Sequence, residues 1–283
     1  MTTDNITRPL EGIRVIGLEQ YMAGPYCTML LADAGAEVIK IEVPGSGDGS
    51  RRAGAIKKGL SSFFETNNRG VKSLTLNLKA AEGKQILHEL IKRADIFGQN
   101  FRPGAAERNG FGYEELKKIN PRLVYASVSA YGLEGPDADL PGTDAVGQAL
   151  SGVTEAFSVP GQPMRTGVAS VADETTAILT FGGVLAALIH AKETGQGQKV
   201  DTSLVGSAFR LMGWTMATFK VRPSILPFPR LPLKKTTDTT ISEYIALLDH
   251  VRRSFTDSRV KKSGSKSSIF MLFGRFLRDS PPV

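Results

Sequence analysis

Residues suited to binding a nucleotide-like ligand follow five segments that have the pattern of strands. Lys79, Arg102 and Arg108 carry positive charges that could meet phosphates, and the rings of Phe101 and Tyr131 could stack on a flat base. Small residues in the same segments would let a ligand approach the backbone. Each segment alone is also consistent with an ordinary turn, but five at one edge of a sheet favour a binding site.

The elements that must position these residues alternate between strand and helix signals. Residues 12–18 and 37–42 are β-rich runs, and residues 23–33 between them indicate a helix that Gly35 ends. Such a unit usually gives a parallel sheet. The sequence therefore predicts an α/β fold with an open, mostly parallel Rossmann-like sheet and flanking helices, in which ligands bind beyond the carboxyl ends of the strands. The other predicted strands cover 73–78, a segment that begins at 96, 123–128 and 199–204, and the other predicted helices cover 80–93, 108–118, 143–153 and 173–194.

Composition excludes several classes of site. The chain is 41% hydrophobic and 22% charged, as is ordinary for a globular protein, and it has the single cysteine Cys27. An internal disulfide and a metal site built on thiolates are therefore excluded, and the three histidines have no metal-ligand spacing, so we expect no metal. The amino-terminal residues are polar, and we find no run long enough to cross a bilayer, so we expect a cytoplasmic protein without membrane contact.

The net charge of +7 is confined to the end of the chain. Residues 221–283 carry twelve Lys and Arg against five Asp and Glu, whereas residues 1–220 carry 23 of each sign. The main body is therefore neutral, and we expect no nucleic acid as a partner. A cluster of four prolines and a polar run also distinguish residues 221–283, which we predict to be a poorly ordered basic tail.

Long, ordered stretches of residues 10–208 resemble family III coenzyme A transferases, the family of formyl-CoA transferase and L-carnitine CoA-transferase. The stretches that match are residues 10–16, 23–25, 31–42, 67–73, 100–104, 120–123 and 186–198. The resemblance implies that residues 10–220 form the large-domain region of such an enzyme. It also implies a homodimer, with coenzyme A as a substrate and no cofactor.

The resemblance implies roles for individual residues. The nucleophilic aspartate of the family precedes the helix that ends in a Thr-Gly-x-Gly-Gln turn, and Asp173 has this place here. Where relatives can place a basic side chain after the second strand, this chain has Val43, so Arg51 or Arg52 would have to supply that phosphate contact. The residues implied to contact CoA are Met22, Ala23, Asn77, Lys79, Asn100, Phe101, Arg102, Arg108 and Tyr131.

A carboxylate suits the transfer of CoA from an acyl-CoA to a carboxylic acid. Its attack on a thioester gives a mixed anhydride, and the returning thiolate then gives an aspartyl-CoA thioester. Backbone N–H groups near a glycine-rich turn would stabilise the oxyanions. From the residues alone, Asp173 could equally be the N-cap of the helix that follows it.

Two alternatives to a transferase remain. α-Methylacyl-CoA racemases share the fold but need an acid and a base, and they place a histidine where this chain has Thr143, so a racemase is disfavoured. The second alternative is a catalytically inactive CoA-binding fragment. Members of the family are longer, and we recognise neither their second small domain nor the return to the first after about residue 221. We therefore expect a C-terminally shortened or frameshifted reading frame.

Overall fold

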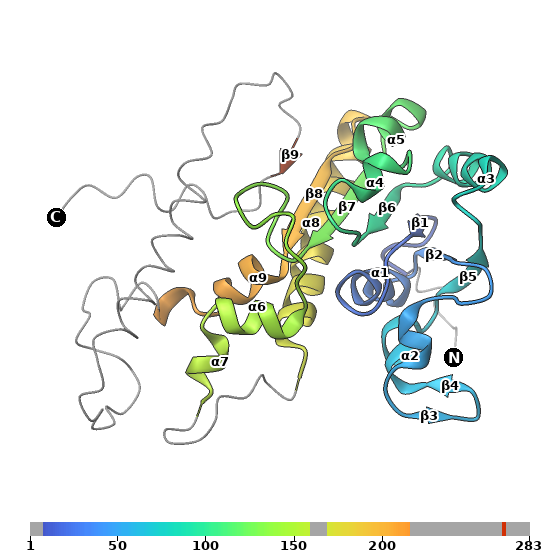
Figure 1. Cartoon of the computed structure of the whole chain (residues 1–283). Coiled ribbons are helices and arrows are strands. Elements are labelled where there is room, and N and C mark those ends of the chain that lie inside the picture. Colours follow the sequence, from blue (N-terminus) through green and yellow to red (C-terminus); the bar gives the residue numbers. More distant parts are fainter. Residues whose placement is uncertain (1–7, 159–168, 216–267, 270–283) are drawn as a thin grey trace, which may run out of the picture. The chain divides into compact units, whose positions relative to one another are not determined.

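The computed structural model describes residues 8–158, 169–215 and 268–269, which form two compact units (Figure 1). Of the described residues, 8–129, 173–202 and 268–269 belong to the first unit, and 130–158, 169–172 and 203–215 belong to the second. The predicted division at residue 221 falls outside the described residues and stays a prediction.

The first unit is built on a sheet with the order β5-β2-β1-β6-β7-β8-β9. The pairs β1–β2, β1–β6, β2–β5, β6–β7 and β8–β9 are parallel, which confirms the α/β prediction. The chain moves outward from β1 to β2 and β5, and then returns to the other side of β1 to add β6 and β7. The order thus reverses between β1 and β6, and ligands bind at such a reversal in open α/β sheets. The strands are β1 (Arg14–Gly17), β2 (Glu37–Glu42), β5 (Lys72–Thr75), β6 (Ile96–Gln99), β7 (Val124–Ser129), β8 (Lys199–Ser203) and β9 (Ser268–Ile269).

Helices cover both faces of this sheet, because neighbouring residues of a strand point to opposite faces. On one face, Val15 belongs to the core cluster that also holds residues of α1 (Ala23–Asp33) and α8 (Val171–Thr194). On the other face, Ile16 packs in a cluster with residues of α3 (Ala81–Ile91) and α5 (Tyr113–Ile119). The central strands β1, β6 and β7 are therefore buried from both sides, so a ligand would meet them at their ends.

In the βαβ unit at the start of the chain, the helix and the second strand have the predicted bounds, whereas β1 covers Arg14–Gly17 and is shorter than the predicted 12–18. Helix α1 covers Ala23–Asp33, and Gly35 follows it with a φ of 107°, a conformation that glycine adopts without strain. Strand β2 covers Glu37–Glu42.

Two predicted helices are interrupted at glycines. The predicted helix over 108–118 is wrong in extent, because α4 (Ala105–Arg108) ends before Gly110, which has a φ of 85°, and α5 follows. The predicted helix over 143–153 is divided at Gly152, with a φ of 82°, into α6 (Asp144–Leu150) and α7 (Val153–Ala156). Left-handed backbone cannot continue an α-helix, so each glycine ends the helix before it.

The segment between β2 and β5 contains short elements that the sequence pattern did not predict. Asn67 and Asn68 lie in a helix of this segment, where the side-chain amide of each donates to the carbonyl four residues earlier. The elements of this segment are η1 (Gly49–Arg52), β3 (Ile56–Lys57), β4 (Leu60–Ser61) and α2 (Ser62–Asn68), and β3 and β4 form a separate antiparallel pair.

Helix α8 is long and apolar enough to cross a membrane by length and composition, with a mean hydropathy of 1.4 over its most apolar part. The expectation that no run is long enough was therefore wrong by this measure. Val184 and Leu188 of α8 are nevertheless buried against the sheet, as is typical of a helix that covers a sheet face.

The second unit contains α6, α7 and α9 (Leu204–Leu211) among its described residues. Gly147 of α6 lies close to Ala172 and Leu204, where an added Cβ atom would meet their side chains at 2.8 and 3.2 Å. The small residue thus permits close packing of α6 against α9.

Candidate functional site

The candidate site lies at the carboxyl ends of β1 and β6, where the strand order reverses. Asn100, directly after β6, crosses this reversal to the loop after β1. Its Oδ1 accepts a hydrogen bond from Gln20 N at 2.8 Å, and its Nδ2 donates to Gln20 O at 2.7 Å. One side chain therefore joins the loops after β1 and β6 through two hydrogen bonds.

The amino terminus of α1 lies at this reversal. Met22 is its N-cap residue but makes no side-chain cap, and the first turn contains no acidic residue. Ala23 and Gly24 are buried at the first helical positions. The first N–H groups of a helix have no partner within the helix and carry partial positive charge, so this end favours an anionic ligand.

Five of the residues implied to contact CoA follow strands β5 and β6 of the same unit, between which β2 and β1 lie. Phe101 is half-buried, with its ring 5.8 Å from that of Phe111, and Arg102 beside it is exposed. Asn77 follows β5 and accepts from Lys79 N at 3.1 Å, while Lys79 itself is exposed. Arg108 is exposed at the end of α4. The carboxyl ends of parallel strands meet at one edge, so the structure brings these residues to the same edge of the sheet.

The two arginines considered as substitutes at Val43 differ in their surroundings. Arg51 forms a two-point ion pair with Glu42, at 2.8 Å through Nε and 2.6 Å through Nη2, and its guanidinium lies over the ring of Phe64. Arg52 is exposed and donates to the backbone oxygen of Ser46. Arg51 is thus already engaged by a carboxylate, whereas the hydrogen bond given for Arg52 goes to a backbone oxygen.

The carboxylate that holds Arg51 is strongly acidic. Burial by itself would raise the pKa of Glu42, but hydrogen bonds from Arg51, Ser73 and the backbone of Asp48 lower this pKa to about 2. Glu42 is therefore ionised at neutral pH and neutralises Arg51.

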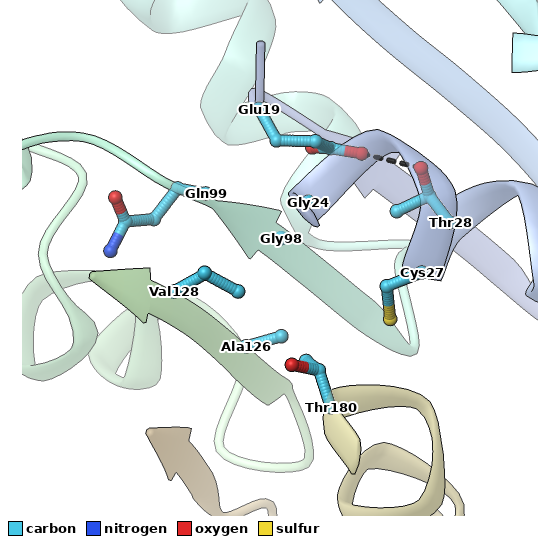
Figure 2. A pocket seen from close by; sticks show the side chains of 9 residues that line it. All are labelled: Glu19, Gly24, Cys27, Thr28, Gly98, Gln99, Ala126, Val128 and Thr180. Atoms are coloured by element: carbon cyan, nitrogen blue, oxygen red, sulfur yellow. Dashed lines mark hydrogen bonds between the residues drawn. The ribbon is translucent and has the colours of Figure 1, made fainter. Parts of the chain in front are cut away.

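A second buried carboxyl group, that of Glu19, lies beside the first turns of α1 and Gly98 of β6 (Figure 2). Its Oε1 accepts from Thr28 Oγ1 at 2.5 Å, whereas its Oε2 has no hydrogen-bond partner in the described part of the chain. Burial raises the pKa of Glu19, although Lys40 and Thr28 act against this. Lys40 forms an ion pair with Asp48, and Arg51 forms one with Glu42. Of these five residues, Glu19 is therefore the one that has no ion pair. It is therefore best accommodated as a neutral acid.

The cavity beside Glu19 is small. Its volume of about 10 Å³ is close to that needed for one water molecule. It is therefore too small to hold a substrate. The residues that line the cavity include Gly24, Gly98, Gln99 and Thr180.

Asp173 lies in the first turn of α8, so it is inside the helix rather than at its N-cap. Later residues of α8, such as Val184, share a core cluster with Ile96 and Val124, the first residues of β6 and β7. Thr180 lines the cavity with Gln99, the last residue of β6. Helix α8 therefore runs antiparallel to these strands. Asp173 precedes Thr180 by seven residues, so it lies about 10 Å beyond Thr180 in the direction of the strands' carboxyl ends.

Tyr131 and the triplet at residues 142–144 belong to the second unit. The hydroxyl of Tyr131 donates to Pro141 O at 3.3 Å. Thr143 is the N-cap residue of α6, and Asp144 accepts from Ala172 N at 2.8 Å. The roles implied for the site residues are not tested by the contacts within each unit, and they stay predictions.

Sequence reasoning missed Glu19, Lys40 and Asp48. Lys40 is fully buried within a strand whose apolar neighbours suggested only a core strand. A charged residue in such a strand is a signal that could have been used, because a buried lysine needs a partner. That partner, Asp48, lies eight residues further on, beyond the turn.

The chain is similar to known CoA-transferases. It matches the model of CoA-transferase family III over residues 10–227. It is 43% identical to the acetyl-CoA:oxalate CoA-transferase of Acetobacter aceti, over 69% of this chain and 51% of that protein. It is 37% identical to the human succinyl-CoA:glutarate CoA-transferase, over 77% of this chain and 50% of that protein.

The fold is also found in a solved structure. A CAIB/BAIF family protein from Brucella suis aligns with a TM-score of 0.73 and 31% sequence identity, over 76% of this chain and 58% of that one. The chain spans about half the length of the curated relatives it matches. These findings confirm the resemblance seen in the sequence: the chain belongs to CoA-transferase family III.

Proposed function

We propose that this chain provides the CoA site and the nucleophile of an enzyme that transfers CoA from an acyl-CoA to a carboxylic acid. The observation that carries the proposal is the place of the family match on the fold. The matched residues supply both the edge at the strand reversal and the helix whose first turn holds Asp173.

The charges at this edge favour coenzyme A as the ligand. Its phosphates would be met by the exposed cations Lys79, Arg102 and Arg108 and by the amino terminus of α1. Arg52 would take the place that Val43 cannot fill. The half-buried ring of Phe101 offers a face for the adenine base.

Asp173 would act as the nucleophile. Its carboxylate oxygen attacks the thioester carbonyl, the C–S bond breaks, and the CoA thiolate leaves behind a mixed anhydride. The thiolate then attacks the carbonyl carbon of Asp173, which releases the first acid and forms an aspartyl-CoA thioester. A second carboxylic acid receives CoA by the reverse of these steps, so atoms and charge balance and no redox partner is needed.

The position of Asp173 suits this role. The first turn of a helix stabilises negative charge, and this includes the carboxylate before attack and the oxyanions formed during it. Relatives are named for acetyl-CoA with oxalate and succinyl-CoA with glutarate, so we propose small acids as donors and acceptors. We extend the proposal to a homodimer in the cytoplasm.

A racemase is a weaker proposal. That reaction needs a base opposite the aspartate, and Thr143 at the place of the family's histidine has no group that takes a proton near neutral pH. A fragment that binds CoA without turnover is the other alternative, because the chain covers about half of its relatives.

Two matched variants test the nucleophile. We expect Asp173→Asn to lower CoA transfer from succinyl-CoA to glutarate, or from acetyl-CoA to oxalate, by about 10³-fold or more, because the amide is not a nucleophile. CoA binding measured by calorimetry should change little. The control is Glu174→Gln, which changes the exposed neighbour and should leave both quantities unaltered. Equal activity of Asp173→Asn and the parent chain would contradict Asp173 as the nucleophile. A parent chain that binds CoA but transfers none would favour the catalytically inactive fragment.

A further inference from the structure

Two consecutive peptide groups after β1 are held at both ends by side chains from other elements. Lys40 Nζ donates to Glu19 O at 2.8 Å, and Asn100 Oδ1 accepts from Gln20 N at 2.8 Å. In the next peptide group, Asn100 Nδ2 donates to Gln20 O at 2.7 Å, and Asp48 Oδ1 accepts from Tyr21 N at 3.2 Å. Such use of all four polar groups fixes the path of the backbone into α1.

Two of the three side chains that hold this backbone, Lys40 and Asp48, are themselves fixed. Lys40 and Asp48 form an ion pair at 2.9 Å with side chains that are 2% and 0% exposed. The backbone of Asp48 donates to Glu42 at 2.7 Å, and its carboxylate also accepts from Ser50 N and Ser50 Oγ. A buried network whose members are all bonded is rigid, so it can impose a conformation on the residues it contacts.

The imposed conformation is strained at Tyr21. This residue has a φ of 65°, in the left-handed region that bulky side chains disfavour. Its side chain is 55% exposed and lies against Gly49, whose lack of a Cβ atom leaves room for the hydroxyl group. A residue stays in such a conformation only where its surroundings hold it, and strain of this kind gathers at ligand sites.

We propose that Asn100, with Lys40 and Asp48, is a positioning residue that keeps the strained backbone at Tyr21 in place. The start of α1, with Met22 and Ala23, is thereby preorganised to bind CoA. Preorganisation lowers the entropic cost of ordering the loop when the ligand binds. The inference rests on the proposed CoA site and changes the role of Asn100, whose polar atoms bind the loop instead of CoA.

The test compares Asn100→Ala with Asn120→Ala in the full chain. Asn120 is a matched control because its side chain also bridges a loop, donating to Ile91 O at 3.0 Å and Ala94 O at 2.7 Å before β7. We expect Asn100→Ala to speed amide exchange at Gln20 and Tyr21 without ligand and to weaken CoA binding about tenfold. Asn120→Ala should lower the melting temperature and leave both of these quantities unchanged.

A rescue experiment separates positioning from direct contact. Asparagine enters the left-handed region more readily than tyrosine, so Tyr21→Asn should restore part of the CoA affinity lost in Asn100→Ala. Loss of affinity without faster exchange, and without rescue, would mean that Asn100 contacts CoA and would overturn the proposal. If Asn100→Ala does not fold, Asn100→Asp, which keeps the acceptor and loses the donor, carries the same readouts.

Failure of the proposed function gives a different result. A parent chain that does not bind CoA at all would contradict the CoA site. The exchange measurement would still decide whether Asn100 holds the strained loop, because it needs no ligand. Unchanged exchange in Asn100→Ala would overturn the inference even where CoA binds normally.

Discussion

Glu19 shows how the residues beneath the candidate site differ from those at its surface. Its carboxyl group is 1% exposed and is surrounded by Gly17, Gly24 and Gly98, which leave the space that it fills. An added Cβ atom at Gly17 would lie 2.5 Å from Glu19 Oε1. These glycines therefore leave space for an acid whose pKa burial raises, while exposed cations remain at the edge of the sheet.

The stability of the protein should depend on the proton of Glu19. The pKa of Glu19 is raised by burial above its ordinary value of 4.5, so the unfolded chain loses this proton before the folded protein does. Stability should therefore fall as pH rises from about 4.5 toward the folded pKa. We expect Glu19→Gln, which is neutral at every pH, to gain stability relative to the parent chain as pH rises from 4 to 8. Urea unfolding across this range measures the difference, and a difference that does not change with pH would contradict a protonated Glu19.

At the scale of elements, the sequence predicted those parts whose boundaries are set locally. Helix α1 and strand β2 have the predicted bounds because Gly35 and Pro44 end them. The short strands β3 and β4 were missed because two residues are too few to show alternation. The hydrogen bonds between Asn100 and Gln20 could not be predicted from sequence spacing. These residues are 80 positions apart, and only the pairing of β1 with β6 brings them together.

The turn between α8 and β8 should be more sensitive to substitution than the helix itself. A Cβ atom on Gly197 would lie 2.0 Å from Leu123 O, which is backbone and cannot move alone. We expect Gly197→Ala to destabilise the protein by about 1–3 kcal/mol or more. Gly182→Ala in α8 is the matched control, because no atom lies within 4 Å of its added Cβ. It should stabilise the helix by roughly 0.5–1 kcal/mol. Thermal unfolding of both variants gives the comparison, and similar effects in the two would contradict this packing.

At the scale of the whole molecule, the match to CoA-transferase family III and the strand order agree on one edge of the first unit. The match could be recognised from the sequence because its motifs surround the strand ends that build this edge. The network of Lys40, Asp48 and Asn100 could not, because each member also fits an ordinary turn or core position. The chain spans about half the length of its curated relatives. The proposal of a transfer reaction therefore rests on Asp173 and on the residues proposed to bind CoA.

The most direct test of this account is to trap the covalent intermediate. The purified chain would be incubated with succinyl-CoA or acetyl-CoA, treated with hydroxylamine, and digested for mass spectrometry. The account predicts a hydroxamate at Asp173 that depends on the acyl-CoA and is absent from Asp173→Asn. Modification at another carboxylate, such as Glu174, would contradict Asp173 as the nucleophile. CoA binding without any adduct would contradict the transferase and leave a CoA-binding chain.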